Sequence, residues 1–447
     1  MNDPNGFSYF NNEYHLFYQF NPNSSMEPGI AHWGHARSPD LFHWEHLPIA
    51  MYPDEWYDKS GVFSGSAIIE NDTMYLLYTG NINRPNEEPD HEQYQALAWS
   101  TNGVDVMKYS DNPVINGTEY QPNIRDPKVW KHKNTYYMVL GNSFNNNTLG
   151  RVLLYSSQDL KHWNQVSILA ESDGTLGYMW ECPDFFEIDG LFVLLFSPQG
   201  IKPEGDKYRN IYQTGYIVGT FDYETYRFNP ISKFKELDHG HDFYATQTLL
   251  DSHNRRILVA WFSMWEQNYP ESVHGWAGQM TIPRQLYLSQ ENNLIQKPVN
   301  EISAIRGKLI YLAKSARGSD VIPLHDKSAE IIIRAIPYLD LELFIESDDG
   351  SAKLTISYDY KKGLVTLDRG GEDGIRRTFW KPAYTHILLW NIFVDASSIE
   401  LFCGHGEVTF SSRFYPTGNL TVTLSINTFV DEMVVTAIDR TVPKPGK

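Results

Sequence analysis

The stretch Ser38–Trp44 reads SPDLFHW, and the stretch Ser157–Trp163 reads SQDLKHW. Each copy follows a short aromatic and aliphatic run, Tyr14–Phe20 (YHLFYQF) in the first case and Tyr136–Asn142 (YYMVLGN) in the second. Three further runs of the same kind lie at Met74–Gly80 (MYLLYTG), Leu191–Ser197 (LFVLLFS) and Arg256–Phe262 (RILVAWF). All five are short, rich in β-forming residues and bounded by turn residues, so each predicts a buried strand.

The five runs recur at intervals of roughly 55–65 residues, which is the length of a multi-strand structural repeat. The segments that follow several of the runs are also related. Ala98–Tyr109, after the second run, is a degenerate copy of the S-x-D-L-x-H-W pattern, and Gly215–Phe228 takes the same place after the fourth run. Five such repeats predict a five-bladed β-propeller. The alternative is five unrelated strands of a sandwich, and the recurring S-x-D-L-x-H-W pattern favours the propeller.

The pattern changes around Lys297–Lys308. Downstream, evenly spaced strand patterns alternate with Gly-rich and Asp-rich turns, which predicts an antiparallel β-sandwich. The predicted strands are Glu330–Ile336, Leu341–Ser347, Lys353–Tyr358, Leu364–Arg369, Ile387–Asp395, Ile399–Cys403, Val408–Tyr415, Leu420–Ile426 and Met433–Asp439. We therefore expect an all-β chain with a propeller at 1–297, a linker at 298–308 and a sandwich at 309–447.

Composition excludes several classes of partner. The 447 residues carry a formal net charge of −18, which repels nucleic acid and anionic membranes, and no run approaches the ~18 apolar residues of a membrane span. Aromatic residues make up 14% of the chain, which suits either stacking on sugar rings or the needs of many strands. Cys182 and Cys403 form no disulfide framework, and His239 with His241 lacks a third metal ligand nearby. We expect no metal and no cofactor.

Three carboxylates lie at similar positions of different repeats. Asp3 lies in MNDPNG beside the first run, Asp126 in NIRDP before the third, and Glu181 in GYMWECPD before the fourth. One such carboxylate alone is more often a turn or capping residue. Because equivalent positions of propeller blades converge on the central axis, we expect these three acids to share one funnel.

Glycoside hydrolysis requires such a cluster. In a retaining enzyme one ionised carboxylate attacks the anomeric carbon, while a protonated carboxyl about 5–5.5 Å away donates to the leaving oxygen. The apolar neighbours of Glu181 in the chain predict surroundings that favour a protonated carboxyl. We expect Asp3 to be ionised, because the amide groups of Asn2 and Asn5 and nearby backbone amides can hold an anion there.

These motifs resemble those of glycoside hydrolase family 32, the invertases and fructan hydrolases. The matching stretches are MNDPNG at Met1–Gly6, FSGS at Phe63–Ser66, RDP at Arg125–Pro127, MWECPD at Met179–Asp184, FYATQT at Phe243–Thr248, IPRQL at Ile282–Leu286 and VDASSIELF at Val394–Phe402. The resemblance covers both predicted domains. It implies a five-bladed propeller followed by a β-sandwich, in agreement with the repeats.

The resemblance also implies roles for individual residues. Asp3 would be the nucleophile, Glu181 the general acid/base, and Asp126 would hold fructose hydroxyls and stabilise the transition state. Arg125 would orient the acids, and Cys182 would tune the proton affinity of Glu181. The remaining positions that match the lining of the fructose pocket are Asn2, Gln19, Trp33, Phe63, Ser64, Asp242 and Trp265.

Within the family, GYMWECPD, SPQG at Ser197–Gly200 and YQTGY at Tyr212–Tyr216 resemble the cytoplasmic sucrose-6-phosphate hydrolases of bacteria. The implied substrates are sucrose 6-phosphate, sucrose and short fructo-oligosaccharides, and the implied location is the cytoplasm. The alternatives are a secreted fructan β-fructosidase or invertase, and a non-catalytic sugar-binding module.

We expect phosphorylated sucrose to be preferred, because two loops after strand runs offer cations for its phosphate. The candidate contacts are Arg209, which comes first because a guanidinium grips phosphate with two hydrogen bonds, then Lys207, Tyr208 and Arg84.

Overall fold

The computed structural model describes residues 1–27, 29–117, 122–318, 320–324, 326–382 and 387–441. In these ranges the chain is built almost entirely of β-strands, with short 3-10 helices at Pro270–His274 and Asn300–Ile305. It divides into two compact units. The first comprises Met1–Lys202, Ile211–Glu236 and Tyr244–Pro283, and the second Pro203–Asn210, Leu237–Phe243 and Arg284–Lys447. None of the described helices has the length and apolar character that crossing a bilayer requires.

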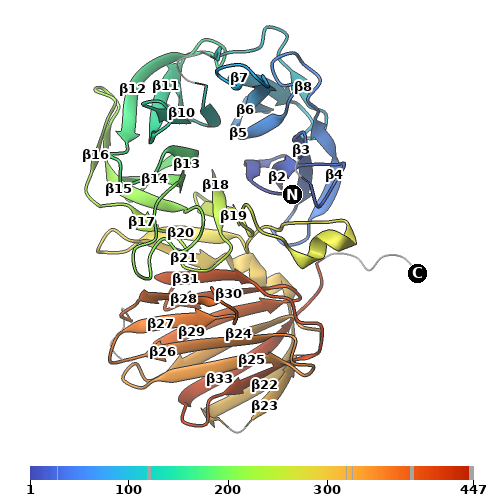
Figure 1. Cartoon of the computed structure of the whole chain (residues 1–447), viewed down its shortest axis with the longest axis vertical. Coiled ribbons are helices and arrows are strands. Elements are labelled where there is room, and N and C mark those ends of the chain that lie inside the picture. The colour runs from blue at the N-terminus through green and yellow to red at the C-terminus, as the bar shows by residue number, and fades with distance from the viewer. Residues whose placement is uncertain (28, 118–121, 319, 325, 383–386, 442–447) are drawn as a thin grey trace. The chain divides into compact units, whose positions relative to one another are not determined.

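The first unit consists of antiparallel sheets arranged around a common centre (Figure 1). Its strands are β1 (Pro4–Phe10), β2 (Glu13–Phe20), β3 (His32–Ser38) and β4 (Glu45–Met51); β5 (Val62–Glu70), β6 (Thr73–Asn83), β7 (His91–Ser100) and β8 (Met107–Lys108); β9 (Ile124–His132), β10 (Thr135–Phe144), β11 (Leu149–Ser157) and β12 (Asn164–Glu171); β13 (Met179–Ile188), β14 (Leu191–Gln199), β15 (Gly215–Asp222), β16 (Arg227–Pro230) and β17 (Lys235–Glu236); and β18 (Tyr244–Leu250) and β19 (Arg256–Trp261). The innermost strands touch in a closed cycle, β1 to β5, β9, β13, β18 and back to β1. This closure confirms the predicted five-bladed propeller.

The repeated S-x-D-L-x-H-W pattern forms the same turn in two blades. The Asp40 carboxylate accepts the backbone N–H of His43 (2.8 Å) and lies 2.6 Å from the Nδ1 atom of that residue, while the Trp44 indole donates to the Leu41 carbonyl (2.8 Å). The copy that begins at Ser157 makes the same three contacts. The repeat is therefore structural in both blades.

Each innermost strand breaks its register close to its start. The shifts lie between Asn5 and Ser8 in β1, Phe63 and Gly65 in β5, Arg125 and Lys128 in β9, Glu181 and Asp184 in β13, and Tyr244 and Thr246 in β18. Three of the shifts contain a non-glycine residue in the left-handed region, Asp126 (φ 65°), Cys182 (φ 48°) and Ala245 (φ 50°). A bulge re-aims the side chains around it, so these breaks redirect residues at one level of all five inner strands.

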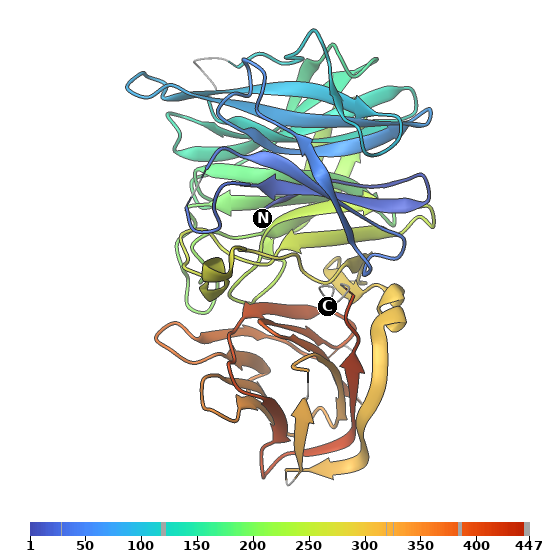
Figure 2. The ribbon, with the colours of Figure 1, turned by 90° about the vertical axis from the view of Figure 1, so that its right-hand side faces the viewer.

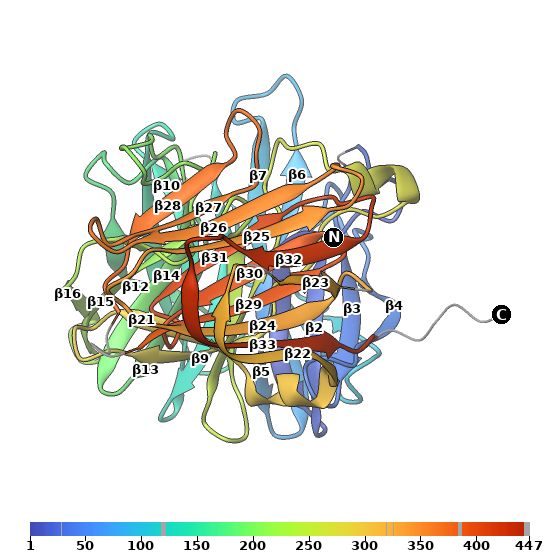
Figure 3. The same cartoon turned by 90° about the horizontal axis from the view of Figure 1, so that it is seen from below.

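The second unit is a sandwich of two six-stranded sheets (Figures 2 and 3). One sheet has the order β22 (Arg306–Arg317), β33 (Phe429–Ile438), β24 (Ala329–Ala335), β29 (Leu388–Asp395), β30 (Ser398–Cys403) and β31 (Val408–Arg413). The other has the order β23 (Val321–Leu324), β32 (Leu420–Leu424), β25 (Leu341–Ser347), β26 (Lys353–Asp359), β27 (Leu364–Asp368) and β28 (Ile375–Phe379). This unit also holds the hairpin of β20 (Arg284–Leu288) and β21 (Leu294–Pro298).

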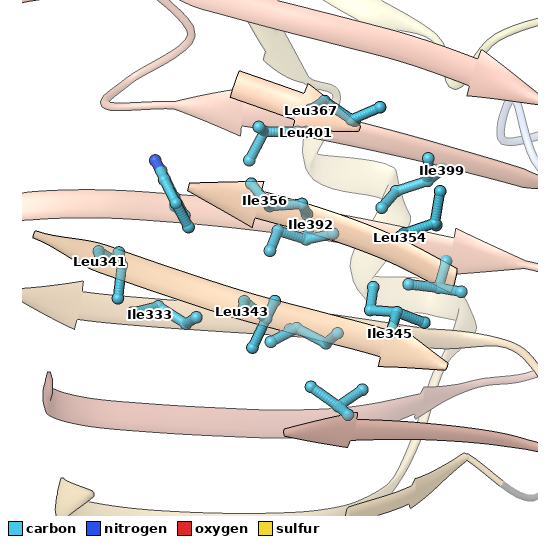
Figure 4. Close-up of a cluster of buried hydrophobic side chains, with 14 of the residues drawn as sticks. Ile333, Leu341, Leu343, Ile345, Leu354, Ile356, Leu367, Ile392, Ile399 and Leu401 are labelled. Atoms are coloured by element: carbon cyan, nitrogen blue, oxygen red, sulfur yellow. The ribbon is translucent and has the colours of Figure 1, made fainter. Parts of the chain in front are cut away.

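The sandwich core follows the alternation of the sequence. In β25, Leu341, Leu343 and Ile345 are buried, and they face Ile333 and Ile392 of the other sheet across the core (Figure 4). All nine predicted strands are present, while β22, β23 and β28 were not predicted. The predicted domain limits stay a prediction, since 203–210 and 237–243 group with the second unit.

Candidate active site

The three predicted acids meet at the register breaks of the inner strands. Asp3 directly precedes β1, Asp126 is the third residue of β9, and Glu181 is the third residue of β13. The thiol of Cys182 lies 3.6 Å from Asp3 Oδ2 and 3.7 Å from Asp126 Oδ2, so it joins two of the acids. Glu181 precedes Cys182 in the chain and lies close enough for its charge to act on both Asp3 and Asp126. The predicted convergence of the three carboxylates is therefore observed.

Asp3 is buried, and its carboxyl group accepts few short hydrogen bonds. Its Oδ1 accepts one strong hydrogen bond, from Asn2 Nδ2 at 2.9 Å, while Ser64 Oγ is 3.5 Å from Oδ2. Burial and the charge of Glu181 raise the pKa of Asp3 to about 6. Asn5 does not help to hold the anion, because its Oδ1 accepts the Gly65 N–H (3.2 Å) and its Nδ2 has no partner among the described residues.

Asp126 is held by the backbone of the neighbouring blade. Its Oδ2 accepts the N–H of Cys182 at 2.9 Å, and its own N–H donates to Thr79 Oγ1 at 3.0 Å. Burial and the charge of Glu181 raise the pKa of Asp126 to about 7. Burial also raises the pKa of the Cys182 thiol well above its ordinary value, so the sulfur keeps its proton and donates to the carboxylates.

Glu181 has polar surroundings, and the predicted apolar setting is wrong. Its Oε1 accepts two hydrogen bonds from Arg125, through Nε (2.9 Å) and Nη2 (2.7 Å), and its Oε2 accepts from Gln199 Nε2 (2.9 Å) and the Tyr244 hydroxyl (2.6 Å). The prediction failed because residues adjacent in a strand point to opposite faces. Trp180 accordingly stacks on Phe196 instead of contacting the carboxyl group.

The predicted lining residues from the first two blades fall into two groups. Asn2, Ser64 and Gln19 lie at or next to Asp3, since Gln19 donates its N–H to the Asp3 carbonyl at 3.0 Å. The side-chain amide nitrogen of Gln19 is buried and has no partner among the described residues, which is typical of a group that binds a ligand. Trp33 is fully buried in the blade, and its indole N–H donates to the Phe63 carbonyl at 2.9 Å, so it fixes the backbone at Phe63.

Two further predicted lining residues lie elsewhere in the chain. Trp265 is 38% exposed and packs edge-on against Trp261, with ring centroids 4.9 Å apart. Asp242 belongs to the second unit, where it is buried and accepts hydrogen bonds from Arg369 Nη1 (2.7 Å) and the Arg413 N–H (2.8 Å).

The candidate phosphate contacts are divided between the units. Lys207, Tyr208 and Arg209 belong to the second unit, where Arg209 pairs with Asp373 at 2.8 Å. Arg84 belongs to the first unit and pairs with Glu92 at 2.6 Å. Both guanidinium groups thus already hold a carboxylate.

Metal ligands do not gather anywhere in the described ranges: no group of three His, Cys, Asp or Glu side chains there could hold an ion. His241 of the predicted pair instead lies with its Nδ1 atom 2.8 Å from the Ser412 hydroxyl. The side chains that the described residues bring together at the site are carboxyl groups, a thiol and hydrogen-bond donors.

Sequence reasoning missed two residues that contact Glu181 directly, Gln199 and Tyr244. Both lie in stretches that match the family, SPQG and FYATQT, but no role was assigned to either. Burial and the charge of Glu181 raise the pKa of Tyr244 well above its ordinary value, so the hydroxyl remains a hydrogen-bond donor.

Comparison with known proteins identifies the family. Residues 1–298 match the glycosyl hydrolases family 32 N-terminal domain, and residues 339–440 match the glycosyl hydrolases family 32 C-terminal domain. A sucrose-6-phosphate hydrolase of Zymomonas mobilis is 38% identical, over 93% of this chain and 85% of that protein.

Solved structures agree with this assignment. The family 32 β-fructofuranosidase of Bombyx mori is 42% identical with a TM-score of 0.92, over 99% of this chain and 92% of that one. The sucrose-6-phosphate hydrolase of Lactobacillus gasseri is 28% identical with a TM-score of 0.88, over 99% and 91% of the two chains. The chain therefore belongs to glycoside hydrolase family 32 and is a β-fructofuranosidase that hydrolyses sucrose or its 6-phosphate.

Proposed function

We propose that the chain hydrolyses β-D-fructofuranosides with retention of configuration, through a covalent fructosyl intermediate on Asp3. The observation that carries the proposal is the contrast between two carboxyl groups of one site. Asp3 accepts one strong hydrogen bond in a buried pocket, whereas Glu181 accepts four from Arg125, Gln199 and Tyr244. Two carboxyl groups in different environments are what a double displacement needs.

Asp3 acts as the nucleophile in this proposal. Its pKa of about 6 leaves it ionised at neutral pH, and its strong hydrogen bond from Asn2 goes to Oδ1. Among the described residues, Oδ2 has two long contacts, to Ser64 and Cys182. A lightly solvated carboxylate oxygen is well suited to attack the anomeric carbon. The bond to the leaving oxygen breaks as the fructosyl–Asp3 bond forms.

Glu181 acts as the acid in the first step and as the base in the second. Its Oε2 atom faces the Tyr244 hydroxyl, which also lies 3.3 Å from the Ser197 carbonyl oxygen. When Glu181 carries the proton, Tyr244 can donate to Ser197; when Glu181 is ionised, Tyr244 can donate to Glu181. The same hydroxyl therefore accommodates both protonation states that the two steps require.

Asp126 and the polar residues beside Asp3 hold the fructosyl unit. Carboxylate and amide groups form paired hydrogen bonds with vicinal hydroxyls, and Asn2, Gln19 and Asp126 provide such groups next to the nucleophile. The raised pKa of Asp126, about 7, reflects the cost of burying its charge and of keeping that charge near Glu181. Positive charge that develops on the sugar in the transition state offsets this cost.

The substrates we propose are sucrose and sucrose 6-phosphate, with short fructo-oligosaccharides as a further class. Preference for the phosphorylated sugar stays a prediction, and a phosphate would have to displace Asp373 from Arg209 or Glu92 from Arg84. A cytoplasmic location rests on the same prediction, because a phosphorylated sugar remains in the compartment in which it is formed. The ratio of kcat/KM on sucrose, sucrose 6-phosphate and inulin tests this choice.

The catalytic proposal is tested by following the product and the nucleophile. Proton NMR of the first fructose released should show the β-anomer, and Asp3→Ala should remove nearly all hydrolysis while leaving the thermal unfolding curve intact. Release of the α-anomer, or an Asp3→Ala enzyme with a tenth of wild-type activity, would contradict the mechanism.

A further inference from the structure

Arg125 is held on two sides. One edge of its guanidinium group, Nε and Nη2, donates to Glu181 Oε1, as described above. On the other side, Nη1 donates to Asn123 Oδ1 at 3.0 Å and lies 3.4 Å from Gln93 Oε1. Because the guanidinium is planar and rigid, contacts on both sides fix the plane in which it meets the carboxyl group.

Asn123 is in turn fixed by its surroundings. Its amide nitrogen donates to Asn147 Oδ1 at 3.0 Å, and its backbone carbonyl accepts from Asn142 Nδ2 at 2.7 Å. Arg125 has no acceptor, so the atom of Asn123 that faces it must be the oxygen. The amide orientation of Asn123 is therefore determined by the network and is compatible with its second contact, to His91.

His91 Nε2 lies 3.0 Å from the same Asn123 oxygen, and His91 Nδ1 lies 2.6 Å from Asp90 Oδ1. The Asn123 oxygen can only accept, so His91 Nε2 is the donor of this contact. A continuous chain of hydrogen bonds then runs from the half-buried His91 side chain through Asn123 and Arg125 to Glu181.

The position of Arg125 matters because two carboxylates attract it. The charges of both Glu181 and Asp126 raise the pKa of Arg125, although burial opposes the charge. Of these two carboxylates, it is Glu181 that accepts hydrogen bonds from the guanidinium group in the described part of the chain. A second anchor is needed to hold a cation on one of two nearby anions.

We propose that Asn123, itself oriented by His91, is a positioning residue that holds Arg125 on Glu181 and so supports the acid step of the reaction. The inference rests on the proposed role of Glu181. Neither residue contacts the reacting atoms in this reading. Loss of Asn123 leaves Nη1 with the long contact to Gln93, and Arg125 then moves relative to the carboxyl group that must donate the proton.

The test compares substrates whose leaving groups differ in their need for a proton. Sucrose requires acid assistance, whereas β-D-fructofuranosyl fluoride leaves as fluoride with little. Because kcat/KM reports the steps up to cleavage of the fructosyl bond, it isolates the acid step. Asn123→Ala should lower kcat/KM on sucrose about tenfold to a hundredfold, as expected for loss of a hydrogen bond to a charged group, and on the fluoride by less than about threefold.

His91 provides a second variant that does not touch Arg125. His91→Ala should reproduce the pattern of Asn123→Ala with a smaller loss on sucrose, and His91→Gln, which keeps a donor for the Asn123 oxygen, should recover much of it. Thermal unfolding of each variant shows whether the fold is intact. Equal losses on both substrates, or no loss on sucrose, would overturn the positioning role.

Glu181→Ala separates the two levels of the inference. If Glu181→Ala spares the fluoride while Asn123→Ala impairs both substrates equally, the positioning role of Asn123 fails and the acid role of Glu181 stands. If Glu181→Ala impairs both substrates equally, the proposed acid role itself fails, and the inference about Asn123 fails with it.

Discussion

Asp3→Asn should make the protein more stable at neutral pH, although it removes the nucleophile. Burial and Glu181 raise the Asp3 pKa from its ordinary 3.8 to about 6. The folded state therefore binds this proton more tightly than the unfolded state does, and stability falls as the pH rises from about 4 to about 6. Above that window the buried charge lowers the free energy of unfolding by a constant amount, about 3 kcal/mol for a pKa shift of this size. An uncharged amide at position 3 avoids this cost.

The substitution suits the local geometry. An amide oxygen at position 3 can still accept from Asn2, and an amide nitrogen in place of Oδ2 faces the Ser64 hydroxyl, which can accept. At pH 7.5 we expect the variant to be more stable than the wild type by about 3 kcal/mol, or on the order of 5 °C in Tm.

Calorimetric or denaturant unfolding at pH 4 and pH 7.5 measures the effect. At pH 4 the wild-type carboxyl is protonated in the folded state and about half protonated in the unfolded state, so the two proteins should differ by less than about 1 kcal/mol. A difference of the same size at both pH values would show that packing, not charge, is responsible. A variant less stable than the wild type at pH 7.5 would refute the electrostatic reasoning.

Three further predictions concern other groups. Cys182→Ala removes a donor to Asp3, so the pKa of Asp3 should rise and the acidic limb of the kcat/KM profile should move to higher pH; an unmoved limb would mean that the thiol only packs. Burial lowers the pKa of His15 to about 4 and that of His35 to about 3, so both are neutral in the fold, and stability should fall as the pH drops below about 6.5. At pH 5, keeping each histidine neutral in the fold lowers the free energy of unfolding by about 2 kcal/mol. His15→Asn, which keeps a donor for His35, should therefore flatten this fall when unfolding is measured at several pH values. Glu181→Ala should lose about 10²–10⁴-fold in kcat/KM on sucrose, which initial rates of glucose release measure; a smaller loss would argue against its acid role.

The repeats were predictable because they are local. The turn at Ser38–Trp44 is stabilised by contacts within seven residues, so its sequence pattern carries its structure and reappears unchanged in another blade. Among the predicted sandwich strands, β25, β27 and β32 alternate buried with half-buried residues, and this period of two is visible in the sequence. The strand β22 was missed because most of its residues are exposed or half-buried, and the sequence gives no sign of a buried face.

The partners of Glu181 were not predictable in the same way, because they come from other strands. Tyr244 and Gln199 lie 63 and 18 residues further along the chain, and their contact with Glu181 depends on how the strands pair. Asp242 lies two residues before Tyr244, yet it belongs to the second unit and binds Arg369 and Arg413 there. Proximity in the sequence therefore does not show which unit a residue joins.

The feature that builds the site is the set of register breaks, and this explains why the sequence identified the acids but not their surroundings. Regular strands would send alternate residues into the blades, where Trp180 and Phe196 pack. The left-handed residues Asp126 and Cys182 interrupt that alternation, and the Cys182 N–H is thereby free to donate to Asp126. Such backbone is costly for a non-glycine residue and is retained where its surroundings impose it. Because β9 and β13 break their register at the same level, the strained backbone and the charged acids lie together around the proposed nucleophile.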